Sequence, residues 1–550
     1  MEIKLIHPPT PSPLNGFHPN LKAYGVKGDG VTDDSSALQK IIDDNKGNVI
    51  VFPSAKGYVI STTLEIPDNT TVVFPRENGK LLIPENHHLK GYEDFFETQD
   101  GGVLEAVITN KNQVDGKNVH IYGAHVDGQR NLALDQAVAG ILLKNCSHSS
   151  VKRCLVERLP FGIEATLVNR RRFYGILLFA AIECHVDGNE VHPVRYENIG
   201  IRYGSKRNKI TNNICIQSTE EVCGHNIQAS SGWDNIFDYL AEENLIHGNV
   251  CLNSNHAGII THDAPRNIVS NNIIKYPSAY GLKAIGVGAF ENVYSDNYVY
   301  KPDGTEDGDG IGIGLLGGAK FNTFNNNTVF EPAYLGVELA ANYNNIDGVM
   351  IIRPAQAGFY IIGGSQNNVN GVTVIESGTN GVQLANASDN VLSNIITNGS
   401  VQHGIFLASG ADKNTITNAI SGFNTKSGIS LSGVSNNSIT SCTARRNKEY
   451  GIILNGSSSN QITNNYCHSN GQKTDNTFDN IVLDGSSNYN NVQNNTCRQG
   501  EETNKPRNGI FSTINTTGNF ITNNDLYDAG KTSNLKALGT GTITTAGNRI

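Results

Sequence analysis

The chain has 550 residues with 58 glycines, 17 prolines, 17% charged residues and a formal net charge of −9. This composition is typical of a turn-rich β protein and argues against a helical or disordered chain. The acidic balance and the lack of a basic stripe exclude nucleic acid as the expected partner. No run approaches the roughly 18 apolar residues of a membrane-spanning helix, so we expect no membrane insertion.

The N-terminal region divides into a proline-rich extended arm at residues 1–20 and a cap at residues 21–105. The segment VTDDSSALQKIIDD in the cap predicts an amphipathic helix with Thr32 as its N-cap and an apolar face formed by Leu38, Ile41 and Ile42. Such a helix covers the open end of a strand stack. The first thirty residues lack the apolar stretch of a secretory signal, so we expect an extracellular protein whose signal was removed, or a virion-associated one.

Residues 106–530 repeat a short pattern of glycine, aliphatic residue, any residue, aliphatic residue, followed by an asparagine-rich turn. Successive opening glycines are separated by 22 to 24 residues in the C-terminal half. A fixed period of this length, built from short strands and turns, predicts an all-β parallel solenoid. A tail or cap is expected at 531–550. The opening glycines of the regular half are Gly312, Gly336, Gly358, Gly381, Gly404, Gly428 and Gly451.

The repeat also predicts which side chains face outward. The residues one and three positions after the glycine are apolar and should point into the coil, whereas the residue two positions after it should point out. Because coils stack in register, these outward residues should form one ladder. The predicted ladder is Leu142, Glu164, Arg202, Gln228, Ile260, Lys283, Glu338, Tyr360, Gln383, Phe406, Ser430 and Ile453.

Two intervals are longer than one coil: Gly162 to Gly200 and Gly224 to Gly258. We interpret the excess as loop insertions near residues 165–198 and 229–248, the second of which contains the only tryptophan, Trp233. Loops on one side of a solenoid usually build the binding site. The predicted groove therefore covers residues 140–340.

The segment YGVKGDGVTDDSSALQ and the asparagine-rich coils resemble the pectate-lyase-like superfamily, which includes pectin-active enzymes, phage tailspike depolymerases and mannuronan C5-epimerases. The resemblance implies a single-stranded right-handed parallel β-helix that acts on a long polysaccharide. The segment DNIFDYLAEENLIHGNVCLNSNHAG is similar to the coil of C5-epimerases that carries a catalytic aspartate and a histidine. That similarity implies catalytic roles for Asp238 and His256. The catalytic set of polygalacturonase hydrolases has no counterpart here.

Several residue types in the groove suit chemistry on a uronic acid. A lyase or epimerase needs a cation for the substrate carboxylate, a base for the C5 proton and an acid on the other side of the bond or ring. Arg202 or Lys283 fits the first role, His256 or His262 the second and Tyr203 the third. A glycoside hydrolase would instead need two carboxylates. Asp238, Asp263 and Glu164 are available for that reaction, and His225 is a further catalytic candidate.

We therefore expect β-elimination or C5-epimerisation of a uronic-acid polymer. Gln228, Trp233, Glu164 and Glu338 are additional substrate-binding candidates. The alternatives are a glycoside hydrolase, including a tailspike-type depolymerase, and a non-catalytic glycan-binding or structural solenoid. No cofactor is required, and the assembly is expected to be a monomer or a tailspike-like homotrimer. A possible Ca²⁺ site is offered by alternate aspartates in a glycine-rich loop, which are Asp303, Asp307 and Asp309.

Overall fold

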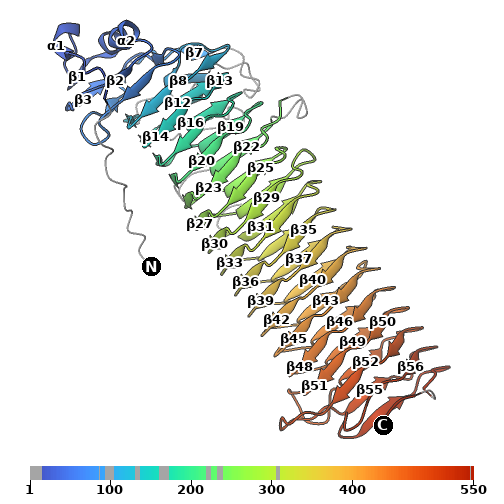
Figure 1. The fold of residues 1–550 in the computed structure, drawn as a ribbon. Helices are drawn as coiled ribbons and strands as arrows, with labels where there is room; N and C mark the ends of the chain where they lie inside the picture. The colour runs from blue at the N-terminus through green and yellow to red at the C-terminus, as the bar shows by residue number, and fades with distance from the viewer. Residues whose placement is uncertain are drawn as a thin grey trace. The chain divides into compact units, whose positions relative to one another are not determined.

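A computed structural model describes residues 15–85, 87–92, 104–129, 137–159, 173–217, 224–231, 239–304, 310–544 and 547–550. The chain forms two compact units, the first made of residues 1–224 and 232–234 and the second of residues 225–231 and 235–550. In both units short parallel strands from successive coils lie beside one another (Figure 1). The expected all-β parallel β-helix is therefore confirmed.

The N-terminal cap contains helices α1 (Leu21–Tyr24) and α2 (Ser35–Asp44). Leu38, Ile41 and Ile42 are buried on α2, as the sequence predicts. The helix nevertheless starts after Asp34 rather than after Thr32, which ends up in strand β1 (Asp29–Asp33). The reason is local, because Asp29 accepts hydrogen bonds from the backbone and hydroxyl of Thr32 and holds it in a turn. Neither helix in the described residues is long and apolar enough to span a membrane.

The first unit has three long parallel sheets and a short two-stranded one, formed by β9 (Gly116–Lys117) and β13 (Cys146–Ser147). One runs from β2 (Val49–Val51) through β5 (Thr71–Val73), β10 (His120–Tyr122), β14 (Ser150–Lys152) and β17 (His185–Asp187) to β20 (Lys209–Thr211). The second contains β1, β3 (Gly57–Val59), β6 (Leu81–Leu82), β11 (His125–Asp127), β15 (Leu155–Glu157), β18 (Glu190–Val191) and β21 (Ile214–Ile216). The third contains β4 (Leu64–Ile66), β8 (Leu104–Asn110), β12 (Ala137–Lys144), β16 (Phe173–Phe179) and β19 (Glu197–Arg202), and β7 (Gly91–Tyr92) joins it antiparallel.

The second unit repeats the same three-sheet coil. One sheet runs from β23 (Leu245–His247) to β56 (Phe520–Thr522) and another from β24 (Val250–Leu252) to β54 (Thr496–Arg498). We call the third the glycine-opened sheet, since its coils begin at the repeated glycines. Its strands are β22 (His225–Ser230), β25 (Ala257–His262), β28 (Tyr280–Ile285), β31 (Ile311–Leu316), β34 (Val337–Leu339), β37 (Phe359–Ile362), β40 (Val382–Ala385), β43 (Ile405–Leu407), β46 (Ile429–Ser432), β49 (Ile452–Asn455), β52 (Ile481–Asp484), β55 (Asn508–Ser512) and β57 (Ser533–Ala537).

The predicted ladder is in register throughout the second unit. Strand pairing joins Gln228, Ile260, Lys283, Gly314, Glu338, Tyr360, Gln383, Phe406, Ser430 and Ile453 in that order. The opening glycine has a steric cause. A Cβ on Gly312 would lie 2.3 Å from the Val329 side chain, and one on Gly336 equally close to Ile351. The glycines therefore make room for aliphatic side chains inside the coil.

In the first unit the sequence interpretation of the ladder is wrong. Leu142 pairs with Leu177, which pairs with Gly200, so Arg202 is two residues away from the ladder position. The coil opens at Gly175, where a Cβ would lie 2.2 Å from Val191. Residues 173–191, expected within an insertion, form the regular strands β16, β17 and β18.

In the second unit the stack continues beyond residue 530, because β57 pairs with β55.

Buried asparagines connect successive coils, as the repeated asparagine doublets suggest. The Asn390 side-chain amide donates to Asn414 Oδ1 at 3.0 Å, and the Asn367 amide donates to Asn390 Oδ1 at 3.1 Å. In doublets such as Asn464-Asn465 the first residue takes a positive φ and the second is buried in the ladder. One asparagine thus makes the turn while its neighbour satisfies backbone groups inside it.

Candidate functional site

A cluster of polar and aromatic side chains lies on the outer side of the glycine-opened sheet in the second unit. Lys283 on β28 and Glu338 on β34 occupy the outward ladder two coils apart, separated by Gly314 on β31. The Tyr280 hydroxyl donates a hydrogen bond to Glu338 Oε2 at 3.3 Å. The Lys283 ammonium lies 4.0 Å from the centre of the Tyr280 ring, which is a close cation–π contact. A cation, a phenol and a carboxylate therefore form one connected group.

Gly314 allows this arrangement. A Cβ at Gly314 would lie 2.6 Å from the Tyr280 ring, closer than any side chain tolerates. The ring of Tyr280 therefore covers the ladder position that Gly314 leaves empty and brings its hydroxyl to the next coil. Ile311 and Leu335 belong to the same buried apolar cluster as Tyr280 and support the ring. The phenol is consequently held in one orientation.

Two predicted histidines lie beside this group. The rings of His225 and His256 are edge to face with centres 4.8 Å apart, and the His256 ring lies 6.4 Å from that of Tyr280. The backbone carbonyl of His256 accepts the Tyr280 amide at 2.9 Å, which fixes the two residues relative to each other. Both histidines are half-buried. Gln228, predicted to contact substrate, is 2% exposed and lies on β22.

His262 and Asp263 lie at the opposite end of β25 from His256. Six residues along an extended strand correspond to about 20 Å, so His256 and His262 cannot act on the same atom. His262 Nε2 is 3.5 Å from Asp263 Oδ2, and Asp263 Oδ1 accepts the Gly288 amide at 2.9 Å. The Asp263 carboxylate thus has a structural role in this turn, and of the two histidines considered as the base, His256 is the one that lies beside Tyr280.

Arg202 and Tyr203 belong to the first unit. The Arg202 side chain is completely buried, and its guanidinium bonds to both carboxylate oxygens of Glu197, which is buried as well. An arginine that is buried and paired in this way does not line an open groove, contrary to expectation. Tyr203 is 8% exposed and packs against Phe179 with ring centres 5.0 Å apart. Arg202 leaves the predicted ladder because of the two-residue shift in strand pairing.

Five of the predicted residues lie outside the described part of the chain: Asp238, Glu164, Trp233, Asp307 and Asp309. Their proposed roles remain predictions. Of the possible Ca²⁺ ligands only Asp303 is described, and its side chain is exposed. The C5-epimerase-like pairing of Asp238 with His256 likewise stays a prediction.

A depression of about 390 Å³ lies farther along the glycine-opened sheet, on coils that the sequence analysis excluded from the groove. Tyr334, Tyr360 and Phe406 contribute aromatic rings to its lining, and Gln356, Gln383 and Gln402 contribute amides. The ladder itself contained the signal, because Tyr360, Gln383 and Phe406 are consecutive outward residues.

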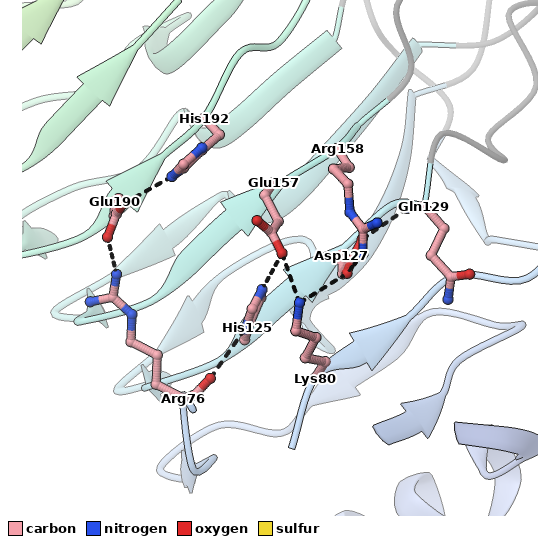
Figure 2. Close-up of polar contacts among 9 residues, drawn as sticks. All are labelled: Arg76, Lys80, His125, Asp127, Gln129, Glu157, Arg158, Glu190 and His192. Atoms are coloured by element: carbon pink, nitrogen blue, oxygen red, sulfur yellow. Dashed lines mark hydrogen bonds and ion pairs between the residues drawn. The ribbon is translucent and has the colours of Figure 1, made fainter. Parts of the chain in front are cut away.

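The first unit carries a second polar cluster, on the outer side of β11, β15 and β18 (Figure 2). Asp127 and Glu157 are paired residues on adjacent strands. Lys80 bridges them, with Nζ 3.4 Å from Asp127 Oδ2 and 3.0 Å from Glu157 Oε1. Arg158 also bonds to Asp127, which is completely buried. On the next coil Glu190 binds Arg76 and accepts from His192 at 2.8 Å.

His125, Asp127 and Glu157 offer potential metal ligands within 4.8 Å of one another, the one such group in the described residues. Lys80 and Arg158 already supply two positive charges to these carboxylates, so an added cation would be repelled. Burial raises the pKa of Glu157, but the hydrogen bonds from His125 and Lys80 outweigh it and the pKa is lowered. An acid catalyst would need the opposite shift. The sequence offered no signal for this cluster beyond isolated charged residues.

Comparison with known proteins supports the architecture. Residues 139–329 match the family model of the right-handed beta helix region, and residues 336–474 match the model of the periplasmic copper-binding protein NosD. The preneck appendage proteins of Bacillus phages PZA and phi29 are each 28% identical to this chain over 142 residues. Those matches cover 26% of this chain and 15% of each phage protein, so the chain matches only a small part of its curated relatives.

The solved structures that resemble this chain in fold have low sequence identity to it. The N-terminal fragment of phage phi29 gene product 12 gives a TM-score of 0.47 at 13% identity, covering 97% of this chain and 93% of the fragment. The family 28 exopolygalacturonase of Yersinia enterocolitica gives a TM-score of 0.47 at 13% identity, covering 68% of this chain and 78% of the enzyme.

Proposed function

Because the chain is a right-handed parallel β-helix of the pectate-lyase-like type, we propose that it acts on a uronic-acid-containing polysaccharide through β-elimination or C5-epimerisation. The proposed site is the outer side of the glycine-opened sheet in the second unit. The observation that carries the proposal is the connected group in which Tyr280 bonds to Glu338 while Lys283 lies over its ring. This group contains the residue types that carbanion chemistry next to a carboxylate requires.

Lys283 would pair with the substrate carboxylate and stabilise the negative charge that develops when the C5 proton leaves. His256 would accept that proton, and the Tyr280 hydroxyl would donate a proton on the other side of the bond or ring. In elimination the C5–H electron pair forms the C4–C5 double bond, the C4–O bond breaks and the leaving oxygen takes up a proton. In epimerisation the carbanion at C5 is instead reprotonated from the opposite face of the ring. Tyr280 thus takes the role that the sequence analysis assigned to Tyr203.

Glu338 would orient the phenol. Its carboxylate accepts the Tyr280 hydroxyl and so fixes the direction of that oxygen in the absence of substrate. Lys283 is 8% exposed, which keeps its charge in a surrounding of low polarity. Electrostatic interactions in such a surrounding are stronger than in water, which favours tight pairing with a substrate carboxylate.

Glycoside hydrolysis is less well supported. That reaction uses two carboxylates on either side of the glycosidic bond, one with a raised pKa. Asp127 and Glu157 are held by Lys80 and Arg158, and Asp263 is bonded to a turn amide. The names of the phage appendage relatives support a virion-associated location, and a monomer or homotrimer remains a prediction.

The test uses the full chain with polygalacturonate, polymannuronate and a neutral glucan as separate substrates. Elimination gives an ultraviolet-absorbing unsaturated product, whereas epimerisation changes the NMR spectrum without shortening the polymer. Lys283→Gln and Tyr280→Phe should each lower the rate at least about a hundredfold, as expected for loss of charge stabilisation or proton transfer. The matched control is Lys275→Gln, which removes a lysine lying over the Tyr300 ring, 5.9 Å from its centre, on β27 (Ile273–Lys275) of another sheet.

The control variant should keep full activity. If Lys283→Gln and Tyr280→Phe were as active as the natural chain, the assigned group would be wrong. If no substrate changed at all but the uronates bound, the non-catalytic glycan-binding alternative would replace the enzymatic one. Release of reducing ends without ultraviolet absorbance would favour the hydrolase alternative.

A further inference from the structure

The depression on coils 334–406 of the second unit has an uncharged lining. It extends over four consecutive coils, with lining residues on β37, β40 and β43 and with Tyr334 and Leu335 just before β34, all within the described residues. Its outer wall is the ladder Tyr360, Gln383 and Phe406. The opposite wall is formed by residues two positions before the opening glycines, which include Gln356 and Gln402. Two rows of side chains, one per coil, thus border a shallow trough.

We propose that this depression is a subsite for a neutral glycosyl residue, so that the polysaccharide substrate contains uncharged as well as acidic sugars. The inference rests on the proposed function in one respect, because it assumes that the same sheet binds the polymer. It assigns a second recognition element of different chemistry, several coils away from Lys283.

Aromatic side chains give the trough two flat apolar surfaces. Tyr360 and Phe406 project from alternate coils with Gln383 between them. Tyr334 adds a third ring and is 42% exposed. The C–H-bearing face of a pyranose packs against such rings with little loss of side-chain entropy, because aromatic residues have few rotatable bonds. Adjacent coils are about 4.8 Å apart, so the two rings are separated by about 10 Å.

Amide groups supply matched polar contacts. The Asn380 amide donates to Gln383 Oε1 at 2.8 Å. This bond orients Gln383 so that its own NH₂ group points away from Asn380. Asn380 is 4% exposed and is itself fixed, because its Oδ1 accepts the His403 backbone amide at 3.1 Å. In the described part of the chain the side-chain amides of Gln356 and Gln402 make no hydrogen bond within the protein. Each amide both donates and accepts, as sugar hydroxyls require.

The lining offers no counter-charge. None of the residues that line the depression is acidic or basic apart from the phenols, and the one charged ladder neighbour, Glu338 beside Tyr360, is a carboxylate that would repel an acidic sugar. The nearest titratable ring, His403, stacks on Phe406 with centres 5.3 Å apart, and its Nδ1 accepts the Ser427 amide at 3.3 Å. Burial, and secondarily the charge of Lys426, lowers the pKa of His403 to about 4, so this ring is neutral at physiological pH. A buried carboxylate without a partner would be costly here.

The two recognition elements are aligned along one ladder. Tyr360 is three coils from Lys283 and Phe406 is five coils from it, which corresponds to about 14 Å and 24 Å at the usual strand spacing. A polymer lying along the coils would therefore present different sugars to Lys283 and to the depression. Neutral residues would occupy the depression while a uronate occupies the reactive group.

The experiment measures binding of the full chain to cellohexaose, mannohexaose and hexamannuronate by isothermal titration calorimetry, with saturation-transfer NMR to map the contacts. At least one neutral hexasaccharide should bind, and Tyr360→Ala and Phe406→Ala should each weaken it about tenfold or more. Tyr360→Phe should retain most of the affinity, because it keeps the ring. Ile453→Ala, on the same ladder beyond the depression, is the matched control and should leave the affinity unchanged.

Lys283→Gln separates this inference from the proposed function. It should abolish turnover of uronates and leave neutral binding unchanged. The subsite is refuted if neither neutral hexasaccharide binds, if hexamannuronate alone binds, or if the Tyr360→Ala and Phe406→Ala variants bind the neutral sugar as well as the natural chain. Neutral binding without any uronate turnover would uphold the subsite and contradict the proposed reaction.

Discussion

His125 Nε2 lies 2.7 Å from Glu157 Oε1, while Nδ1 of the same ring faces the carbonyl oxygen of Arg76 at 3.1 Å. A carbonyl oxygen only accepts hydrogen bonds, so Nδ1 carries a hydrogen. The contact with Glu157 then requires a second proton between the ring and the carboxyl group. The hydrogen bonds from His125 and Lys80 outweigh burial and lower the pKa of Glu157, so its carboxylate form is favoured. The contact between His125 and Glu157 ties β11 to β15.

Replacement of Glu157 should change the acid sensitivity of the protein. A lowered pKa means that Glu157 contributes stability above its unfolded value of about 4.3 and loses it as the pH falls through the folded value. We expect Glu157→Gln to reduce the unfolding free energy at pH 7 by about 1–3 kcal/mol, since Lys80 and His125 lose a charged partner. The variant should also show a smaller loss of stability between pH 5 and pH 3. Urea unfolding across this range measures both effects.

His192→Gln is the control for this prediction. His192 also bonds to a glutamate, Glu190, but its side chain is 35% exposed, so its removal should cost less than about 1 kcal/mol. If Glu157→Gln and the natural chain lost the same amount of unfolding free energy between pH 5 and pH 3, Glu157 would not be stabilised as a carboxylate.

Substitution of Gly314 should displace Tyr280. The added Cβ of Gly314→Ala would lie 2.6 Å from the Tyr280 ring, so the ring must rotate and its hydroxyl must leave Glu338. We expect a loss of about 1–3 kcal/mol in the unfolding free energy, as for other overpacked sites. Turnover of the uronate substrate should fall as far as it does in Tyr280→Phe. Denaturant unfolding and the ultraviolet assay provide the two measurements.

A double-mutant cycle isolates the steric cause. In the Tyr280→Ala background the space is open, so Gly314→Ala should have almost no further effect on stability. If the cost of Gly314→Ala stayed the same in that background, the backbone of β31 rather than the ring would be responsible.

The sequence was sufficient for the architecture because the coil repeat is a local pattern. The glycine period identifies strands and inward residues directly, and the ladder from Gln228 to Ile453 is in register as predicted. The sequence-based assignment of outward residues failed where the period breaks. Several glycines lie between Leu142 and Arg202, and the sequence does not show which of them opens a coil. Gly175 is identified only by its contact with Val191 in the structure.

The site was predicted only in part for a related reason. Lys283 and Glu338 were found because they occupy ladder positions, but Tyr280 was missed. It precedes the glycine and was therefore not considered outward-facing, and its reach across Gly314 depends on a residue three strand positions and one coil away. The cluster of Lys80, Asp127 and Glu157 joins coils up to 77 residues apart, which no local pattern indicates.

Loss of a ladder asparagine should destabilise the second unit. The Asn390 amide donates to Asn414 Oδ1 and to the Gly364 carbonyl, both at 3.0 Å, and the residue is completely buried. Asn390→Ala removes the partner of the Gly364 carbonyl and that of the Asn367 backbone amide, which donates to Asn390 Oδ1 at 2.9 Å, at a cost of about 1–3 kcal/mol for each unsatisfied group. Asn368→Ala removes an exposed amide bonded to Asn345 and should cost less than about 0.5 kcal/mol. Comparable urea midpoints for the two variants would contradict the structural role of the ladder.

His403 should make the second unit less stable in mild acid. Burial and the neighbouring Lys426 lower its folded pKa to about 4, whereas an unfolded histidine titrates near 6.5. The unfolded chain therefore binds more protons between these values, and the stability contributed by neutral His403 is complete above about pH 6.5 and is lost as the pH falls toward 4. We expect His403→Gln to flatten the pH dependence of the urea midpoint in this window, with the difference reaching about 3 kcal/mol at most. Lys426→Gln should flatten it less, because burial is the larger cause. An unchanged slope in His403→Gln would show that the ring is protonated in the folded chain, and the depression beside it would then carry a charge.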